Sequence, residues 1–299
     1  MKKNVIISLA DSNYFELLNE LIDSIKRFEE SKNVAICILN AGLKKNEIES
    51  LSKKVDEIKD ANWDISVPKH KIGKKEWLKS QVSRAFLPNY FPEYEKYLWI
   101  DADAWVNSWE TIELFFNGCE NNKLAIATSA DRNYGRVLRA EWVFKSFATI
   151  KSQNYKHAKS SGFSEKIARQ VALMPHLNIG VFSLKKNAPH WEIWQKNLRL
   201  ALSKGKIWGS EQIAMNITVY EDNLPVEILP AYCNWTLLSK LKYDQKKNKL
   251  VEFYLPHHEI GIVHLAGKNN DHIRYNKEYL SEIKTLDGKI IKKNLRFNS

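Results

Sequence analysis

The stretch Tyr97-Leu98-Trp99-Ile100-Asp101-Ala102-Asp103 joins an apolar strand directly to two acids. Two carboxylates so close together repel each other and are costly to remove from water, so a cation is expected between them. In an extended segment, residues two apart face the same side. Hard cations prefer carboxylate oxygens, which favours Mg²⁺ or Mn²⁺ carrying a phosphorylated ligand. The alternative is that the two acids cap a helix expected near residues 108–116.

The segments around this stretch predict an α/β sheet. Strand patterns at 5–9, 34–39, 63–67 and 97–100 alternate with helical patterns at 14–25, 48–58 and 77–87. Such alternation is typical of parallel βαβ units. Ligands bind beyond the carboxyl ends of the strands in these sheets. Asp11 follows the first strand and Asp101 ends the fourth, so neighbouring strands would bring both acids to one edge.

The second half of the chain is less regular. Apolar strands are expected at 124–127, 177–184 and 260–265, and helices at 191–202 and 212–219. We interpret the chain as one domain over 1–285, in which 131–172 forms a mostly helical, basic and aromatic insertion. Two lysine-rich stretches, 240–249 and 284–296, resemble a solvated loop and tail. Residues 286–299 are therefore assigned to a basic C-terminal tail.

Composition narrows the class of protein. Apolar residues make up 44% of the 299 residues, and no apolar run approaches the roughly 20 residues of a bilayer span. Residues 1–10 faintly resemble a signal peptide, but Asp11 stops the apolar run, so a first core strand is favoured. Three widely separated cysteines, Cys37, Cys119 and Cys233, indicate a reducing compartment, and we expect a cytoplasmic protein.

The charge of the chain favours anionic partners. Lysine and arginine exceed the acids by 46 − 35, a net charge of +11. Nucleotides, anionic lipid surfaces and nucleic acids all fit this charge, so charge alone does not choose between them.

A second candidate ligand follows the last apolar strand. His264 ends that strand and precedes a turn with Gly267 and Lys268. An imidazole among carboxylates leans towards Mn²⁺ over Mg²⁺. Gly267 would let the backbone approach a phosphate, and Lys268 would offset its charge. A core histidine before a turn is the alternative.

Two further motifs suit sugar chemistry. Asn178 and Gly180 interrupt a strand, where an amide can bind sugar hydroxyls and a glycine permits close approach; a β-bulge explains them equally well. Glu211 and Gln212 open a helix after Gly209. They could flank a reacting centre, although an acid at a helix N-terminus often serves only local electrostatics.

Taken in order, these motifs resemble glycosyltransferase family 8, the retaining, metal-dependent GT-A enzymes that include bacterial lipopolysaccharide galactosyl- and glucosyltransferases. The resemblance spans roughly residues 4–270. The matching segments are 10–14, 39–43, 83–87, 97–103, 177–184, 211–216 and 264–268. The resemblance implies a GT-A (Rossmann-like) fold, a mixed central sheet flanked by helices, as in nucleotide-diphospho-sugar transferases.

The resemblance also implies a role for each matching residue. The roles cover the nucleotide, the metal, the diphosphate, the donor sugar and the acceptor. The uracil and ribose of a UDP-sugar would be held by Ala10, Asp11, Asn13 and Tyr14, and the phosphate or donor-sugar region would contact Arg84. A Mn²⁺ (or Mg²⁺) ion and the diphosphate would be bound by Asp101, Ala102, Asp103 and His264, and a phosphate by Gly267 and Lys268. The donor sugar would contact Asn178 and Gly180, the β-face of the anomeric carbon would face Glu211 and Gln212, and the acceptor or donor would contact Asp131.

The sequence departs from the family pattern at two positions. The family usually places its phosphate-binding lysine six positions after the histidine, followed by Pro-Trp, and here that position is Asn270. Lys268 sits two residues earlier, and a shorter turn could restore its role. Glu211 stands where aspartate is commoner, so its reach differs by one methylene.

The implied reaction moves a hexose from UDP to a hydroxyl of a cell-surface glycan or glycolipid with retention of configuration. Same-face attack is favoured, in which Glu211 and Gln212 stabilise an oxocarbenium-like transition state. In the insertion, Trp142, Phe144, Phe147 and Tyr155 could stack on sugars, while Arg132, Arg136 and Arg139 suit an anionic glycolipid; a small helical core is the alternative. The basic tail could attract the negative inner face of the plasma membrane.

Three other functions compete. A haloacid-dehalogenase-like Mg²⁺ phosphatase also uses two acids after a strand, but it expects Thr or Val where Trp105 stands, and a later acidic pair. A basic nucleic-acid-binding protein would not require Asp101, Asp103 and His264, so we expect no nucleic-acid partner. A protein of the same fold that only binds sugars is the third.

Overall fold

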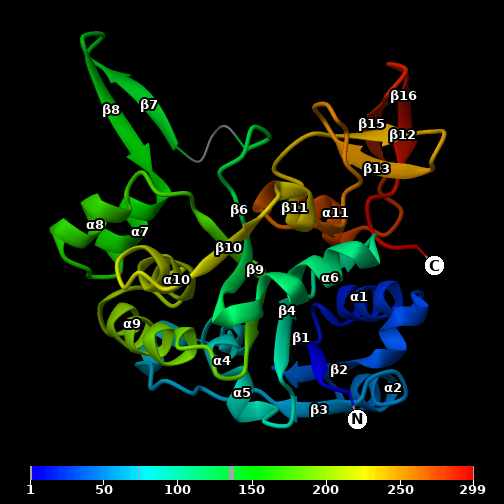
Figure 1. Ribbon diagram of the computed structural model, residues 1–299, viewed down its shortest axis with the longest axis horizontal. Coiled ribbons are helices and arrows are strands. Elements are labelled where there is room, and N and C mark those ends of the chain that lie inside the picture. Colours follow the sequence, from blue (N-terminus) through cyan, green and yellow to red (C-terminus); the bar gives the residue numbers. More distant parts are fainter. Residues whose placement is uncertain (1, 74, 135–137, 299) are drawn as a thin grey trace.

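The computed structural model describes residues 2–73, 75–134 and 138–298. Its centre is a seven-stranded sheet in the order β10-β6-β9-β4-β1-β2-β3 (Figure 1). Neighbouring strands run parallel except for β9, which is antiparallel to β4 and β6. The strands are β1 (Asn4–Ala10), β2 (Val34–Asn40), β3 (Glu57–Asp60), β4 (Lys96–Ile100), β6 (Leu124–Thr128), β9 (Leu177–Lys185) and β10 (Val226–Leu229). This mixed, Rossmann-like sheet confirms the expected α/β class.

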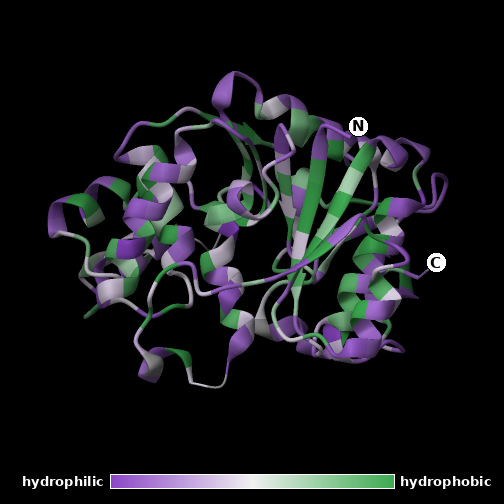
Figure 2. Cartoon of the chain, turned by 90° about the horizontal axis from the view of Figure 1, so that it is seen from below, coloured by the Kyte–Doolittle hydropathy of each residue, from purple (hydrophilic) through white to green (hydrophobic). Residues whose placement is uncertain are grey.

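Each sheet face packs against its own layer of helices. Alternate residues of β1 enter different cores: Val5 and Ile7 on one face, Ile6 on the other. Helices α1 (Phe15–Lys26) and α6 (Trp109–Gly118) cover the Ile6 face, and α9 (His190–Lys204) and α10 (Ser210–Tyr220) cover the opposite face (Figure 1). Figure 2 shows the hydrophobic strands between helices whose outer surfaces are largely hydrophilic.

Short helices complete these layers. They are α2 (Lys45–Leu51), α3 (Lys69–Ile72), α4 (Ser80–Ser83), α5 (Leu87–Tyr90), α11 (Asp271–Tyr275) and the 3₁₀ turns η1 (Glu29–Asn33), η2 (Glu76–Lys79), η3 (Arg84–Phe86), η4 (Glu120–Asn122), η5 (Ala231–Asn234) and η6 (Lys268–Asn270). The helix expected at 77–87 is thus a series of short turns. Among the described residues, no helix has the length and apolar character needed to cross a membrane.

The third strand is displaced from its predicted position. It is β3 at Glu57–Asp60, paired in parallel with Cys37–Asn40 of β2, and not the segment 63–67. Helix α2 correspondingly ends at Leu51, before the Val55 and Ile58 that were assigned to it. Ile65 and Val67 are buried, but they pack into the core without joining the sheet. The apolar pattern of 63–67 correctly indicated burial, but the prediction that this segment is a strand of the sheet is wrong.

The insertion at 131–172 is not all helical. It begins with a hairpin of β7 (Leu138–Val143) and β8 (Phe147–Ser152), so the helical prediction is wrong there. Helices α7 (Gln153–Ser160) and α8 (Glu165–Val171) follow and share a small core with α10. The hairpin forms because its backbone groups form hydrogen bonds across the two strands. The spacing of the aromatic residues along the sequence does not reveal this pairing.

The lysine-rich C-terminal stretches are ordered strands, not a solvated loop and tail. A four-stranded sheet contains β12 (Leu241–Asp244), β13 (Lys249–Glu252), β15 (Ser281–Thr285) and β16 (Ile290–Lys293). Leu295 and Phe297 are buried in its core, and the buried Arg296 pairs with Glu20 of α1. Apolar residues that alternate with lysines place the lysines on the outer face. A small sheet of β11 (Trp235–Thr236), β14 (Ile262–His264) and β5 (Ala104–Val106) links this region to the central sheet.

Candidate metal and nucleotide-sugar site

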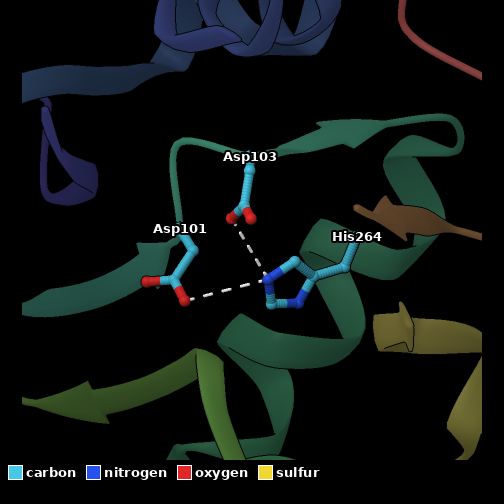
Figure 3. A group of neighbouring side chains, drawn as sticks. All are labelled: Asp101, Asp103 and His264. Atoms are coloured by element: carbon cyan, nitrogen blue, oxygen red, sulfur yellow. Dashed lines mark ion pairs between the residues drawn. The ribbon is translucent and has the colours of Figure 1, made fainter. Parts of the chain in front are cut away.

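The carboxyl end of β4 and the end of β14 bring three possible metal ligands together. One ligand atom from each of Asp101, Asp103 and His264 lies within 4.8 Å of the others (Figure 3). His264 Nε2 is 3.8 Å from Asp101 Oδ2 and 3.3 Å from Asp103 Oδ1. The pairing of β14 with β5 sets His264 opposite Ala104, one residue beyond Asp103. This pairing joins residues that are far apart in the sequence.

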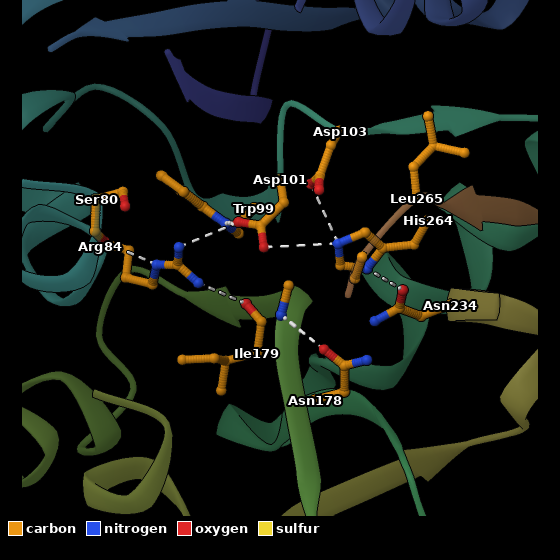
Figure 4. Close-up of polar contacts among 12 residues, drawn as sticks. Ser80, Arg84, Trp99, Asp101, Asp103, Asn178, Ile179, Asn234, His264 and Leu265 are labelled. Atoms are coloured by element: carbon orange, nitrogen blue, oxygen red, sulfur yellow. Dashed lines mark hydrogen bonds and ion pairs between the residues drawn. The ribbon is translucent and has the colours of Figure 1, made fainter. Parts of the chain in front are cut away.

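The His264 ring is held in one orientation. Its Nδ1 lies 3.0 Å from Asn234 Oδ1, and donation to that oxygen leaves Nε2 facing the two acids (Figure 4). Such an outer partner fixes the tautomer that a metal ligand needs. Burial alone would lower the pKa of His264, but the hydrogen bond and charge of Asp103 outweigh it and raise that pKa. The same contact contributes to a lowered pKa for Asp103, against the effect of burial.

Gly180 leaves the room that this cluster occupies. A Cβ atom at this position would lie 2.4 Å from His264 Cε1 and 2.9 Å from Asp101 Oδ2. The Asp101 N–H donates to the Gly180 carbonyl over 2.8 Å, so the two backbones are in direct contact. Asn178 beside it accepts a hydrogen bond from the Gly180 N–H at 3.1 Å. The glycine is therefore required by close approach of a neighbouring side chain.

Two arginines neutralise the acids by pairing with the carboxylate oxygens that do not face His264. Buried Arg84 lies 3.1 Å from Asp101 Oδ1, donates to the Ile179 carbonyl and stacks 4.7 Å above the Trp99 ring (Figure 4). Arg274 Nη1 lies 3.3 Å from Asp103 Oδ2 and donates to the Leu265 carbonyl. One oxygen of each acid thus remains directed toward His264.

The three ligands fit a divalent ion. Ligands at about 2.1 Å from a metal lie roughly 3 Å apart when they occupy adjacent octahedral positions. The separations of 3.3 and 3.8 Å from His264 Nε2 to the two acids are close to this spacing, and all three ligand atoms lie within 4.8 Å of one another. Two carboxylates with one imidazole suit a metal such as Mn²⁺. The two arginines offset the repulsion between the acids.

Glu211 is an acid with no hydrogen-bond partner for one oxygen. It lies at the start of α10, is 3% exposed, and its Oε2 is buried without a hydrogen bond. Burial raises its pKa to about 7; the Arg84 charge acts against this rise and the Asp101 charge adds to it. These charges act on Glu211 because it lies near Arg84 and Asp101. A buried carboxyl whose pKa is strongly raised is typical of a functional group.

Gln212 is fixed by a buried hydrogen-bond chain. Its Nε2 donates to the Leu177 carbonyl at 2.8 Å and lies 2.7 Å from His176 Nε2. His176 Nδ1 in turn lies 2.5 Å from Asn154 Oδ1. Burial lowers the pKa of His176 to about 3, so the ring is neutral and can accept from Gln212. Helix α7 of the insertion thereby helps to orient the Gln212 side chain.

The expected nucleotide residues lie at the same sheet edge. Ala10 pairs with Asn40 where β1 and β2 end. The Asp11 carboxylate accepts from the Asn13 N–H and the Asn13 side chain, both at 3.0 Å. Tyr14 packs edge-on against Tyr275 at 6.5 Å. Burial raises the pKa of Tyr14, and the Asp103 charge adds to it.

Asp131 is not one of the three residues of the cluster. Its carboxylate accepts hydrogen bonds from Asn133, and it lines a cavity of about 240 Å³ that also contacts Asn154 and His176. The cavity therefore borders the chain that orients Gln212. Arg132 pairs with Glu252 in the C-terminal region. Arg136 lies outside the described residues, and so does the side chain of Arg139.

The turn after His264, which we expect to contact a phosphate, is only partly described. Gly267 has a φ of +99°, which favours glycine, and the Lys268 side chain lies outside the part of the chain that the structure describes. Asn270, at the position of the family's lysine, is buried and donates to the Ala266 carbonyl at 2.6 Å. Asn270 therefore closes the turn.

Sequence reasoning missed four residues that support the site: Arg274, Asn234, His176 and Asn154. Arg274 is ten positions beyond His264 in a short helix, and no spacing rule connects it with Asp103. Asn234 precedes a two-residue strand. These residues could have been found as polar residues at positions predicted to be in the core, because buried polar groups are usually hydrogen-bonded.

Comparisons with known proteins agree with this architecture. The Glycosyl transferase family 8 profile matches residues 5–269. The galactosyltransferase LgtC, solved with donor and acceptor sugar analogs, superposes with a TM-score of 0.56 at 12% identity, covering 88% of this chain and 87% of that one.

Two other solved structures share the fold. Mouse xyloside xylosyltransferase 1, in its apo form, gives a TM-score of 0.53 at 12% identity and covers 90% of this chain and 99% of its own. The bifunctional glycosyltransferase WbbM gives 0.56 at 18% identity, covering 89% of this chain and 46% of its own. No curated protein sequence matches the chain.

Proposed function

The chain belongs to glycosyltransferase family 8 and is a glycosyltransferase of GT-A fold, and from that premise we propose that it moves a hexose from a UDP-sugar to a hydroxyl group with retention of configuration. The observation that carries the proposal is the set of Asp101, Asp103 and His264 at the carboxyl edge of the sheet, where such folds bind nucleotides. The family match sets aside the phosphatase and the non-catalytic alternatives.

The metal would be held by the three ligands of this set. We favour Mn²⁺, because an imidazole joins the two carboxylates. A bound divalent ion supplies charge stabilisation to the departing diphosphate. Asp101 and Asp103 each keep one oxygen for this purpose, and Gly180 keeps the space beside them open.

The donor would lie across the sheet edge. Asp11, Asn13 and Tyr14 are at the end of β1, where we place the uracil and ribose. Arg84 and Arg274 supply cationic charge on either side of the acids, close to where the diphosphate would bind. Because Asn270 closes its own turn, we assign to Arg274 the charge that the family's lysine usually contributes, with Gly267 and Lys268 beside it.

The sugar would be activated without a protein nucleophile. Gln212 is committed to His176 and Leu177, and Glu211 has one buried oxygen without a partner. We assign both to stabilising the oxocarbenium-like transition state, with Asn178 and Gly180 near the donor sugar. The acceptor proton would pass to a UDP phosphate oxygen during same-face attack.

The acceptor we propose is a glycan or glycolipid of the cell surface, of the lipopolysaccharide or capsule type, modified at the cytoplasmic side. The cavity beside Asp131 is open to such a chain and borders the Gln212 contacts. The positive charge of the protein favours an anionic acceptor.

Donor selection and metal dependence test the proposal together. A panel of UDP-sugars with Mn²⁺ should identify one donor by thermal shift, and NMR of the product should show a retained anomeric configuration. Asp103→Ala should lose at least about a hundredfold in turnover, because it removes a metal ligand. The exposed Glu282→Ala on β15 serves as the matched control. Full activity of Asp103→Ala in EDTA would overturn the metal assignment.

A further inference from the structure

The β7–β8 hairpin presents an apolar face to solvent. Cross-strand pairing places Trp142 opposite Ala148 and Ala140 opposite Ile150, so these four side chains share one face. Trp142 is 74% and Ile150 63% exposed. The opposite face carries Glu141 and Lys151, which form an ion pair. The hairpin is therefore amphipathic.

The tip of the hairpin is apolar on both faces. Phe144 is 89% and Phe147 69% exposed, beside Lys145 at the turn. Figure 1 shows the hairpin projecting from the body of the molecule above α7 and α8. Its strands are hydrogen-bonded only to each other among the described strands. A lone two-stranded hairpin with this much exposed apolar surface needs a partner.

The charges on the hairpin indicate the kind of partner. Residues 142–151 contain Lys145 and Lys151 and no acid, and Glu141 is already paired. Aromatic residues at a tip flanked by lysines are typical of segments that enter the headgroup region of an anionic bilayer. A second copy of this chain would bring the same net charge of +11 and repel the tip.

A second projection lies on the same side of the molecule. The β15–β16 turn points in the same direction as the hairpin in Figure 1. It exposes Ile290 (69%), Leu286 (40%) and Lys289. Two separate apolar and basic projections on one side can meet a flat surface together.

We propose that the protein binds anionic lipid bilayers through the tip of the β7–β8 hairpin, with the β15–β16 turn as a second contact. This surface is distinct from the catalytic edge, and the proposal does not depend on the donor or the metal. Of the predicted tail, residues 286–299, only the β15–β16 turn would take part, because Leu295, Arg296 and Phe297 are buried.

Vesicle binding by the full chain tests this proposal. Wild-type protein should sediment with phosphatidylcholine vesicles that contain phosphatidylglycerol and remain unbound with phosphatidylcholine alone. The Trp142→Ser/Phe144→Ser double variant should bind at least about tenfold more weakly, since two large apolar groups no longer insert. Lys145→Ala should weaken binding about fivefold. Leu200→Ser, at a 43% exposed apolar position on α9, is the control and should bind normally.

Site-specific labelling distinguishes insertion from other contacts. Cys37, Cys119 and Cys233 are buried, so a Phe144→Cys variant can be labelled selectively with an environment-sensitive dye. The dye emission should shift to the blue with anionic vesicles, and a dye at Leu200→Cys should not shift. Unchanged emission at position 144, or equal vesicle binding by the double variant, would overturn the proposal. The proposal would also be overturned if wild-type protein bound no vesicles and the double variant had a different oligomeric state from wild type in light scattering.

Discussion

At the scale of single residues, the site depends on how each acid divides its two oxygens. Asp101 gives one oxygen to Arg84 and Asp103 gives one to Arg274, and their remaining oxygens face His264. The arginines lower the cost of holding two carboxylates together in a partly buried place. The same residues therefore explain both why the acids are tolerated and why they can accept a metal.

Glu211 leads to a prediction about pH at this scale. Its pKa is about 7 in the folded protein, against an ordinary value of 4.5, because burial disfavours the charged form. Between these values the folded protein keeps a proton that the unfolded chain has lost. The free energy of unfolding should therefore fall as the pH rises from about 4.5 to 7. Glu211→Gln should remove this fall and stabilise the metal-free protein by about 2–3 kcal/mol at pH 8.

Urea unfolding at pH 5 and pH 8 checks this expectation. The exposed Glu282→Gln on β15 is the matched control and should follow the wild-type pH dependence. If Glu211→Gln and wild type lose the same stability between the two pH values, the assignment of that titration to Glu211 is wrong.

At the scale of elements, one hydrogen-bond chain connects the insertion with Gln212 of α10. Asn154 of α7 contacts His176 before β9, and His176 contacts Gln212 of α10. Asn154 also donates to the carbonyls of Val171 and Met174, so it joins α7 to the segment that precedes β9. The insertion is therefore coupled to the orientation of a proposed catalytic amide.

His176→Ala tests this coupling. The Gln212 amide would lose one of its two contacts, while Asp101, Asp103 and His264 would keep all of theirs. We expect turnover to fall about 10- to 100-fold, as for other positioning contacts. The affinity for UDP with Mn²⁺, measured by calorimetry, should change less than about twofold, since the nucleotide residues lie on β1. An equal loss in both quantities would indicate a general structural defect instead.

At the scale of the whole molecule, the C-terminal residues connect distant parts of the fold. Arg296 pairs with Glu20 of α1 and donates to the Arg274 carbonyl at 2.9 Å. The Leu295 carbonyl accepts from the Trp105 ring at 2.8 Å. The residues after β16 thus support α11, which brings Arg274 to the candidate metal site. Residues that the composition assigned to a tail are part of the frame of the site.

Deletion of residues 287–299 should therefore be costly. It removes β16, two buried apolar side chains and the partner of Glu20, a loss on the order of 5 kcal/mol or more in the free energy of unfolding. Thermal unfolding should show a large fall in Tm and weakened UDP binding. The Lys289→Ala/Lys292→Ala variant, which removes only exposed charges, should unfold within about 0.5 kcal/mol of wild type per site. If the truncated protein were as stable as wild type, the interpretation of these residues as a solvated tail would be correct after all.

The sequence by itself determined the buried strands of the sheet, the edge at which Asp11 and Asp101 lie, and the order of motifs that identifies the family. Those features are local, because runs of apolar residues and the acids that follow them are read within a few positions. Only the tertiary structure decided which polar groups meet: Asp103 and Arg274 are 171 residues apart and touch because β14 pairs with β5.

The tertiary structure also decided the secondary structure of segments whose sequence pattern was ambiguous. The lysine-rich stretches became strands and the aromatic segment became a hairpin, since backbone pairing and burial against distant residues outweigh local propensity.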